Sequence, residues 1–372
     1  MEIIKRTAIE AAPGYNEMEV RFHIIDPIFR QLGYSDGENV YLNLEEKLEY
    51  PYVHIGRRSK KDVPLGFPDY RAGLKGARGS FVLEAKAGNV RITNLEVEQA
   101  HSYAAHAQVG ANYFALCNGI EIRIYETLSG PSAVPIAVIP LSEVNERFHE
   151  LENILSPVSL EKNCKIFYDT KLKLCDGLGS STQVRSGEYK ISDYQYNIFL
   201  NNRDYTEEIR KNTPQIAEMD KQLELLKTAF ELRVADGIAE RGNDGRITAF
   251  VRFSGATIHN AAAMQLLGVD RLSFVTAAKF LSKSADSPTI FESIKDFYLP
   301  KGAALPQMFG GISQINNDIS GKMFVKAAIF FDGECMRGQY LVLSDYTFTM
   351  PVGGVMRMEF SWSGLFTLII DK

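Results

Sequence analysis

The stretch Phe-Pro-Asp-Tyr at 67–70, followed after a glycine-rich turn by Phe-Val-Leu-Glu-Ala-Lys-Ala at 81–87, decides how the first half of this chain is interpreted. Side chains two residues apart on a strand share a face, so Glu84 and Lys86 point the same way and the alanine between them points to the opposite side. If the segment with Asp69 pairs beside this strand, a second carboxylate joins the first. Two carboxylates form the oxygen-rich pocket that Mg²⁺ prefers, and with a lysine they suit metal-dependent hydrolysis of a phosphodiester.

The tripeptide Glu-x-Lys is uninformative by itself, because this chain contains it also at 45–47 and 188–190. Only the copy at 84–86 sits in an apolar strand, follows a Pro-Asp pair at hairpin distance and lies between two predicted helices. The alternative interpretation is that Glu84 is a half-buried strand carboxylate held in a salt bridge.

Hydrophobic periodicity predicts the order helix, three strands, helix, two strands around this stretch. The first helix ends at Gly33, a stop signal, and the last two strands flank Asn118-Gly119, the strongest short hairpin signal. The three strands in the middle are expected to form a meander. The predicted elements are, in order, a helix at 15–32, strands at 40–50, 66–74 and 80–87, a helix at 94–108, strands at 113–117 and 121–125, and a helix at 145–154.

The second half is predicted to be a separate domain of mixed α+β or β-rich character. Residues 161–190 are expected to form a linker, since 176–187 is rich in Gly, Ser and Thr. The linker separates a first domain at 1–160 from a C-terminal domain at 191–372, whose function is not readable from its residues. The predicted elements there are helices at 213–233, 259–267 and 272–282, and strands at 324–331, 339–343, 356–362 and 365–370.

The helix predicted at 213–233 carries an apolar seam with a 3-4-3-4 spacing. Such a seam can pack on its own domain or pair with a second copy of the helix, and two heptads are too few to establish a coiled coil. Packing on its own domain is favoured, and a homodimer through this helix is the alternative. The seam consists of Ile216, Met219, Leu223, Leu226 and Phe230.

The composition excludes several classes of protein. With 372 residues, 45% hydrophobic and 23% charged, the chain has the length of two domains and an ordinary globular composition. Its four cysteines form no Cys-x-x-Cys pair, so neither a zinc knuckle nor a redox dithiol is indicated. The N-terminus lacks the apolar stretch of a signal peptide, and no run approaches the length of a membrane span. We therefore expect a soluble cytoplasmic protein without a membrane partner.

A locally basic stretch lies in the first half, although the formal net charge of the chain is -5. Its basic residues face only two acids, Asp62 and Asp69. We predict that this stretch contacts DNA phosphates, with Arg57, Arg58 and Arg71 as candidate contacts; a pair of solvated loops is the alternative. The basic residues are Arg57, Arg58, Lys60, Lys61, Arg71, Lys75 and Arg78.

Several further sequence segments, together with the Pro-Asp and Glu-Ala-Lys elements, match the motifs of a known protein family. They are Asn-Glu-Met-Glu-Val-Arg at 16–21, Ile-Asp-Pro-Ile-Phe at 25–29, Leu-Gly-Tyr at 32–34, the Gln-x-x-x-Tyr signature at 99–103, and Tyr-Phe-Ala-Leu-Cys-Asn-Gly at 113–119. With these segments, residues 15–127 resemble the N-terminal nuclease domain of type I restriction enzyme R subunits, a branch of the PD-(D/E)XK nuclease superfamily.

The resemblance implies a restriction-endonuclease-like αβββαβ core, and thus an α/β (α+β) fold. It implies that Asp69 and Glu84 bind Mg²⁺, with Mn²⁺ as a substitute, and that Lys86 positions or polarises the attacking water. The helical carboxylate of the first motif is assigned to Glu17, with Glu19 as its rival.

The helix at 94–108 adds two supporting residues to this predicted site. Gln99 and Tyr103 lie four residues apart, which places them on one face of the helix, one turn apart. There they are expected to contact DNA or to orient the metal ligands. A plain helix surface is the alternative.

The chain departs from full R subunits in one respect. Those proteins continue into a translocase with phosphate-binding Gly-x-x-x-x-Gly-Lys-Ser/Thr loops, whereas Gly321-Lys322 lacks both the upstream glycine and the hydroxyl. We therefore expect a Mg²⁺-dependent endodeoxyribonuclease of a restriction or defence system, without an ATP site. The alternatives are a non-catalytic module that binds nucleic acid or protein, and the nuclease subunit of a larger restriction-modification complex.

Overall fold

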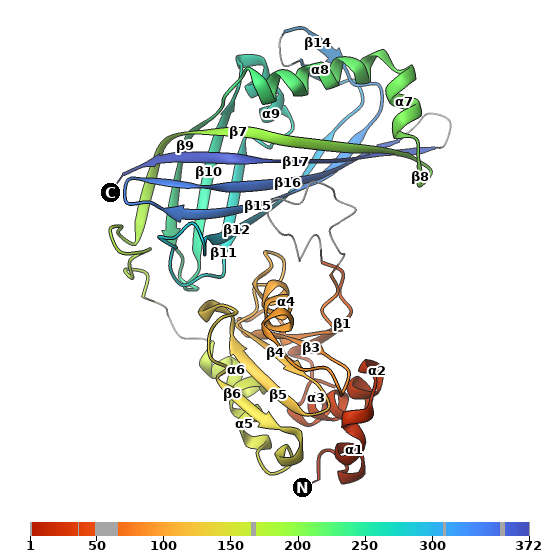
Figure 1. Cartoon of the computed structure of the whole chain (residues 1–372), viewed down its shortest axis with the longest axis vertical. Helices are drawn as coiled ribbons and strands as arrows, with labels where there is room; N and C mark the ends of the chain where they lie inside the picture. The colour runs from red at the N-terminus through yellow and green to blue at the C-terminus, as the bar shows by residue number, and fades with distance from the viewer. Residues whose placement is uncertain are drawn as a thin grey trace. The chain divides into compact units, whose positions relative to one another are not determined.

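The Pro-Asp segment leads into the second strand, and the Glu-Ala-Lys segment ends the third strand, of a mixed sheet of six strands in a computed structural model of the protein (Figure 1). The structure describes residues 2–35, 37–48, 66–164, 169–307, 310–349 and 354–371. The chain divides into two units, the first mainly Met1–Tyr52 and Pro64–Tyr168, the second mainly Asp169–Thr276 and Phe280–Lys372. The first unit is of the mixed α/β class that the sequence predicts.

The sheet of the first unit begins as an antiparallel meander of three strands, as predicted. Its third strand then pairs in parallel with the fourth, through a crossover that contains helix α4 (Asn94–Ala105). The remaining pairs are antiparallel. In spatial order the strands are β1 (Val40–Leu44), β2 (Tyr70–Leu74), β3 (Ser80–Ala85), β4 (Tyr113–Cys117), β5 (Glu121–Glu126) and β6 (Ala137–Pro140).

Helices cover both faces of this sheet, because its strands carry apolar side chains on each side. One face packs against helices α2, α3, α5 and α6 through a cluster that includes Phe29, Tyr70, Phe81 and Ala85. The other face packs against α4 through a cluster that includes Val82. The helices are α1 (Arg6–Ala11), α2 (Glu17–Val20), α3 (Asp26–Leu32), α4, α5 (Phe148–Leu155) and α6 (Pro157–Asn163).

The helix predicted at 15–32 is continuous from Glu17 to Leu32, but its middle turn, η2 (Arg21–Ile25), is a π-helix. Asn16 starts it with a capping box, and Gly33 ends it with a left-handed φ of 94°. A π turn rotates the residues before it relative to those after it, and such turns are frequent at functional sites. The elements β6, α1 and α6 were not predicted from the sequence.

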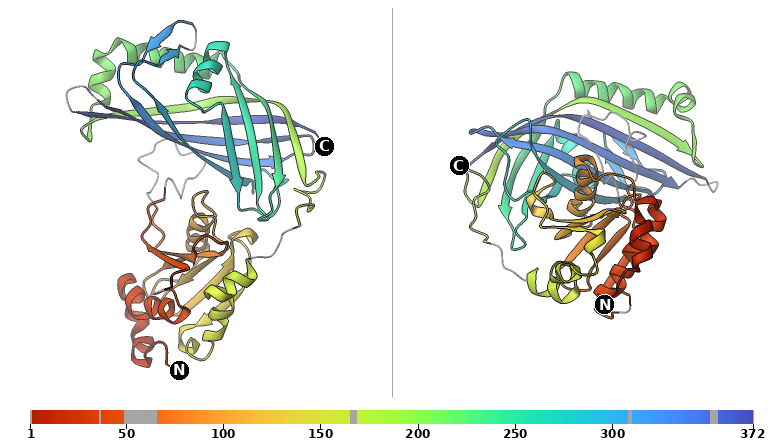
Figure 2. Two further views of the ribbon diagram at one scale, coloured as in Figure 1. Left: turned by 180° about the vertical axis from the view of Figure 1, so that it is seen from behind. Right: turned by 60° about the horizontal axis from the view of Figure 1, so that its bottom comes forward.

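The second unit is a closed barrel of eight antiparallel strands (Figure 2). The short strand β8 (Arg203–Asp204) is added at β7 (Figure 1). The ring closes because the last strand pairs with the first. In spatial order the strands are β7 (Ser181–Leu200), β9 (Leu232–Arg241), β10 (Ile247–Gly255), β11 (Arg271–Thr276), β12 (Thr289–Leu299), β15 (Ile319–Phe331), β16 (Cys335–Thr349) and β17 (Val355–Ile370).

Alternating apolar side chains from all eight strands of the ring fill its interior, among them Phe274, Phe291 and Tyr340. Eight-stranded barrels enclose just enough space for side chains to fill. The other elements of this unit are α7 (Thr206–Asn212), α8 (Pro214–Thr228), α9 (Ile258–Leu266) and the hairpin β13 (Ala304–Pro306) with β14 (Ile312–Gln314).

The apolar seam of helix α8 packs on its own unit. Ile216, Met219 and Leu223 lie against Tyr196 and Phe360 of the closed sheet. The remaining two seam residues, Leu226 and Phe230, pack with Ile191 and Leu232. The favoured alternative, packing of the seam on its own domain, is therefore confirmed, with Leu226 buried and the other four residues half-buried. A homodimer through this helix stays a prediction.

Several predictions for the second half were wrong. The segment 272–282, predicted as a helix, contains strand β11, whose Leu272 and Phe274 alternate into the barrel. The helix predicted to reach 233 ends at Thr228. The two strands predicted at 356–362 and 365–370 are one strand, β17. The stretch at 176–187, predicted as part of a linker, already contains the first residues of β7.

Among the described residues, no helix has both the length and the apolar character that crossing a membrane requires.

Candidate active site

The fold brings Asp69 and Glu84 side by side. Strands β2 and β3 pair with Tyr70 opposite Leu83, so Asp69, just before β2, falls opposite Glu84. The backbone N–H of Ala85 donates to Asp69 Oδ2 at 2.7 Å. Both residues are buried, with Asp69 8% and Glu84 4% exposed. Two carboxylates thus share a small region that has little access to water.

Lys86, the first residue after β3, completes this arrangement. Its Nζ donates to Glu84 Oε1 at 2.9 Å and to Gln99 Oε1 at 3.3 Å. Gln99 is held in turn, because its Nε2 donates to the hydroxyl of Tyr103 at 2.9 Å. Helix α4 therefore orients the lysine through a chain of two hydrogen bonds, and Gln99 and Tyr103 lie beside the site instead of on a plain helix surface.

The electrostatics of the site oppose its full ionisation. Burial, with the neighbouring Asp69 carboxylate, raises the pKa of Glu84 to about 7, although the Lys86 ammonium acts in the opposite direction. Burial also raises the pKa of Asp69, against the lowering effect of the Ala85 N–H. Within the described part of the chain, the buried Glu84 Oε2 has no hydrogen-bond partner. A buried oxygen of this kind is costly unless a ligand satisfies it.

The first helix places the charge of Glu17 near both carboxylates, whereas Glu19 caps the start of the helix. The negative charge of Glu17 is close enough to raise the pKa of both Asp69 and Glu84. The Glu19 carboxylate instead accepts the N–H of Asn16 at 2.8 Å, as part of the capping box that starts the helix. The geometry thus supports Glu17 over its rival.

Arg21 also belongs to the site, although it was not among the predicted site residues. Its Nη1 lies 2.7 Å from Glu45 Oε1 and 3.6 Å from Asp69 Oδ1. Its guanidinium lies 5.1 Å from the centre of the Tyr70 ring. Arg21 follows Glu17 by four residues, so both lie on one side of a helix, and this spacing was the only signal for it in the sequence.

The donor set fits a magnesium ion. Mg²⁺ is commonly held by one or two carboxylates and fills its other positions with water and substrate phosphate oxygens. Asp69 and Glu84 provide such a pair, and Glu84 Oε2 is a buried oxygen without a protein partner among the described residues. In the same part of the chain, no three His, Cys, Asp or Glu side chains gather closely enough to enclose a metal ion by themselves.

The predicted DNA contacts are only partly within the described residues. Arg57 and Arg58 lie outside them. Arg71, on β2, follows Asp69 by two residues, and Asp69 continues the register of this strand, so the two share a face of the sheet. Its Nη1 lies 3.0 Å from Glu46 Oε2.

This arrangement can hold a divalent cation beside a fixed ammonium group on a face flanked by arginine. No protein-family model and no curated protein sequence matches this chain.

Proposed function

We propose that the first unit is a Mg²⁺-dependent nuclease that hydrolyses phosphodiester bonds of DNA at Asp69, Glu84 and Lys86. The observation that carries the proposal is the buried pair of carboxylates next to a lysine, with Glu84 Oε2 lacking a partner among the described residues. The three-strand meander, the α4 crossover and the parallel β3–β4 pair agree with the restriction-endonuclease-like core that residues 15–127 resemble.

A structural salt bridge explains these residues less well. A lone Glu84–Lys86 pair would need no second carboxylate, and Asp69 raises the cost of ionising Glu84. Mutual repulsion between buried acids is typical of sites where a ligand or a reaction stabilises the charges. The carboxylates are thus better explained as ligands than as part of the framework.

In the proposed reaction, Asp69 and Glu84 would hold the metal ion and Lys86 acts on the substrate. The chemistry that Mg²⁺ would supply there is positive charge at the phosphoryl oxygens and a lower pKa of the attacking water. Lys86 Nζ, fixed by Gln99 Oε1, donates to the water or to the phosphoryl oxygen on which negative charge develops. Arg21 holds the Asp69 carboxylate in place through its contact with Oδ1. Glu17 lies at the edge of the site, where its charge acts on both carboxylates.

A setting in a restriction or defence system follows from the same resemblance, and we propose it with the activity. Partner subunits of a restriction-modification complex and a cytoplasmic location belong to this proposal. Co-purification with a translocase or methyltransferase would support the complex.

The proposal is tested by cleavage of supercoiled and linear DNA by the full chain with Mg²⁺ or Mn²⁺, beside an EDTA control. Lys86→Ala should lower the cleavage rate at least about 100-fold, the usual cost of removing a preorganised charge-stabilising donor. Lys190→Ala is the matched control, because Lys190 belongs to the same tripeptide at 188–190 but is exposed and pairs with Glu231 at 3.0 Å. This control should cut like the wild-type protein.

Two results would contradict the proposal. One is equal cleavage by wild-type and Lys86→Ala proteins, which would indicate a contaminating nuclease. The other is the absence of cleavage by folded wild-type protein with both metals and both substrates, which would favour a binding module or a nuclease that needs a partner subunit.

A further inference from the structure

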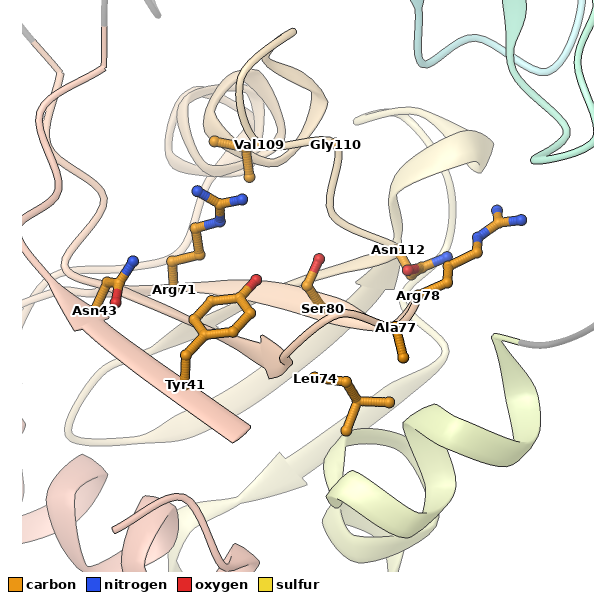
Figure 3. A pocket seen from close by; sticks show the side chains of 11 residues that line it. Tyr41, Asn43, Arg71, Leu74, Ala77, Arg78, Ser80, Val109, Gly110 and Asn112 are labelled. Atoms are coloured by element: carbon orange, nitrogen blue, oxygen red, sulfur yellow. The ribbon is translucent and has the colours of Figure 1, made fainter. Parts of the chain in front are cut away.

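A polar hollow of about 470 Å³ lies on the first unit, away from Asp69 and Glu84 (Figure 3). Its floor is the sheet at β1, β2 and the turn into β3, and one wall is the loop after α4, at Val109 and Gly110. Two of its lining residues are arginines. The polar residues that line it are Tyr41, Asn43, Arg71, Arg78, Ser80 and Asn112.

The hollow opens on the same face of the sheet as the candidate active site. Arg71 follows Asp69 by two residues, and Ser80 precedes Glu84 by four, so each pair shares a face by strand alternation. Four residues on a strand span about 13 Å, and two span about 7 Å. Arg71 therefore lies between Asp69 and the far end of the hollow, about one step of a nucleic-acid strand from the site.

The chemistry of the lining indicates an anionic ligand. The Arg71 guanidinium is fixed, because its Nη1 lies 3.1 and 3.0 Å from the two carboxylate oxygens of Glu46 and its centre lies 5.6 Å from the centre of the Tyr41 ring. Within the described residues, its buried Nε has no hydrogen-bond partner. Figure 3 shows the Arg71 guanidinium and the Ser80 hydroxyl on the same side of the sheet. A planar fork of this kind suits phosphate oxygens.

We propose that this hollow binds a second phosphate of the same nucleic-acid strand, near the phosphate that is cut at Asp69 and Glu84. The inference rests on the proposed function, because the second phosphate is defined by its distance along the strand from the phosphate that is cut. Arg71, Arg78 and Ser80 supply the contacts. Binding at the hollow fixes the direction in which the strand crosses β2, and hence which bond reaches Lys86.

The test is the binding of fluorescein-labelled single-stranded and duplex oligonucleotides to the full chain in EDTA, followed by fluorescence anisotropy over a range of salt concentrations. Arg78→Gln should weaken binding roughly tenfold and lower the slope of log K against log salt by about 1, as expected for one lost phosphate contact. Ser80→Asp, which places a negative charge in the hollow and leaves both arginines intact, should weaken binding at least as much. Arg30→Gln is the control, because Arg30 is exposed on α3, which covers the other face.

The outcomes separate this inference from the proposed function. Unchanged affinity and salt slope in both folded variants would overturn the second phosphate site, even if cleavage depends on Lys86. Weakened binding by both variants without any cleavage by the wild-type protein would support the hollow and count against the nuclease. A third outcome is that inorganic phosphate raises the unfolding temperature of the wild-type protein but not that of Arg78→Gln, and that both proteins bind the oligonucleotides equally well. The hollow would then bind a free anion, and the inference would fail.

Discussion

The buried carboxyl group of Glu84 makes the unfolding free energy of the first unit depend on pH. Its pKa rises from 4.5 to about 7, first because of burial and then because of Asp69. Between these two values the folded chain keeps a proton that the unfolded chain has released. Stability therefore falls as the pH rises through this window, the opposite of the trend for a carboxylate in a favourable salt bridge.

We expect Glu84→Gln to remove this dependence from the metal-free protein. The wild-type chain in EDTA should lose on the order of 1–3 kcal/mol of unfolding free energy between pH 5 and pH 8 relative to the variant. The measurement is urea denaturation of both proteins at the two pH values, with exposed Glu98→Gln as the control on the same unit. An identical pH dependence in the wild-type and Glu84→Gln proteins would show that Glu84 is ionised at little cost.

The sequence predicts the centre of the site but not its surroundings. Strand alternation pairs Glu84 with Lys86, and helix periodicity pairs Gln99 with Tyr103, because both are local rules. The family resemblance, and not a local rule, placed the two pairs in one predicted site. The contacts of Arg21 depend on how the first helix docks on the sheet, and no local rule contains that information. The capping box of Asn16 and Glu19 is a local pattern, whereas the approach of the Glu17 charge to the carboxylates depends on the same docking.

At the scale of elements, the segment after β3 contacts the N-terminal segment so closely that no side chain fits between the two backbones at Gly88. The N–H of Gly88 donates to the carbonyl of Tyr15 at 2.7 Å. A Cβ atom on Gly88 would lie 2.0 Å from the carbonyl oxygen of Ala12, and one on Gly119 would lie 2.1 Å from it. This close approach fixes the chain two residues beyond Lys86.

Gly88→Ala should therefore destabilise the protein by about 1–3 kcal/mol, the usual cost of overpacking, because the opposing atom is backbone and cannot rotate away. Gly14→Ala is the matched control, since a Cβ there meets no atom within 4 Å. Urea denaturation of the two variants gives the comparison. Equal stability of both would mean that the N-terminal segment moves aside freely.

Helix α8 offers a second pair of variants, Leu226→Ala and Leu225→Ala. The two residues have the same helix propensity, but Leu226 is 6% exposed and Leu225 is 43% exposed. The first substitution should cost about 2–5 kcal/mol and the second much less. Sedimentation velocity of the wild-type chain and both variants should give one unchanged oligomeric state. A change of that state in Leu226→Ala alone would support the dimer interpretation of the seam.

Prediction recovered the elements of the first unit apart from β6, α1 and α6, and it failed in much of the second for one physical reason. In the first unit the turn and cap signals are local, such as Gly33 and Asn118-Gly119. In the second, strand β11 was predicted as a helix because the apolar positions of a short segment fit both periods. Only its pairing with β10 and β12 decides between them, and that pairing is not local.

At the scale of the whole molecule, each unit has a hydrophobic core of its own. Phe81 belongs to the core of the first unit and Phe291 to the interior of the barrel. Two separate cores make a single two-state transition an unsuitable description of unfolding.

Scanning calorimetry should accordingly show two transitions. Phe81→Ala and Phe291→Ala each remove a fully buried ring, at a cost of about 3–5 kcal/mol. Each variant should lower the temperature of one transition and leave the other near its wild-type value. If both variants shifted one common transition by similar amounts, the two units would be a single cooperative body.

The pairing that closes the ring, between β7 and β17, has a consequence for the order in which the protein is made. Its partners include Val184 and Ile370, which are separated by most of the second unit. Contacts this distant in sequence slow folding, and domains generally fold as units during synthesis, the N-terminal one first. The barrel cannot close before β17 has left the ribosome, whereas every strand of the first sheet has emerged well before that. The unit with the candidate active site is therefore able to fold while the barrel is still being synthesised.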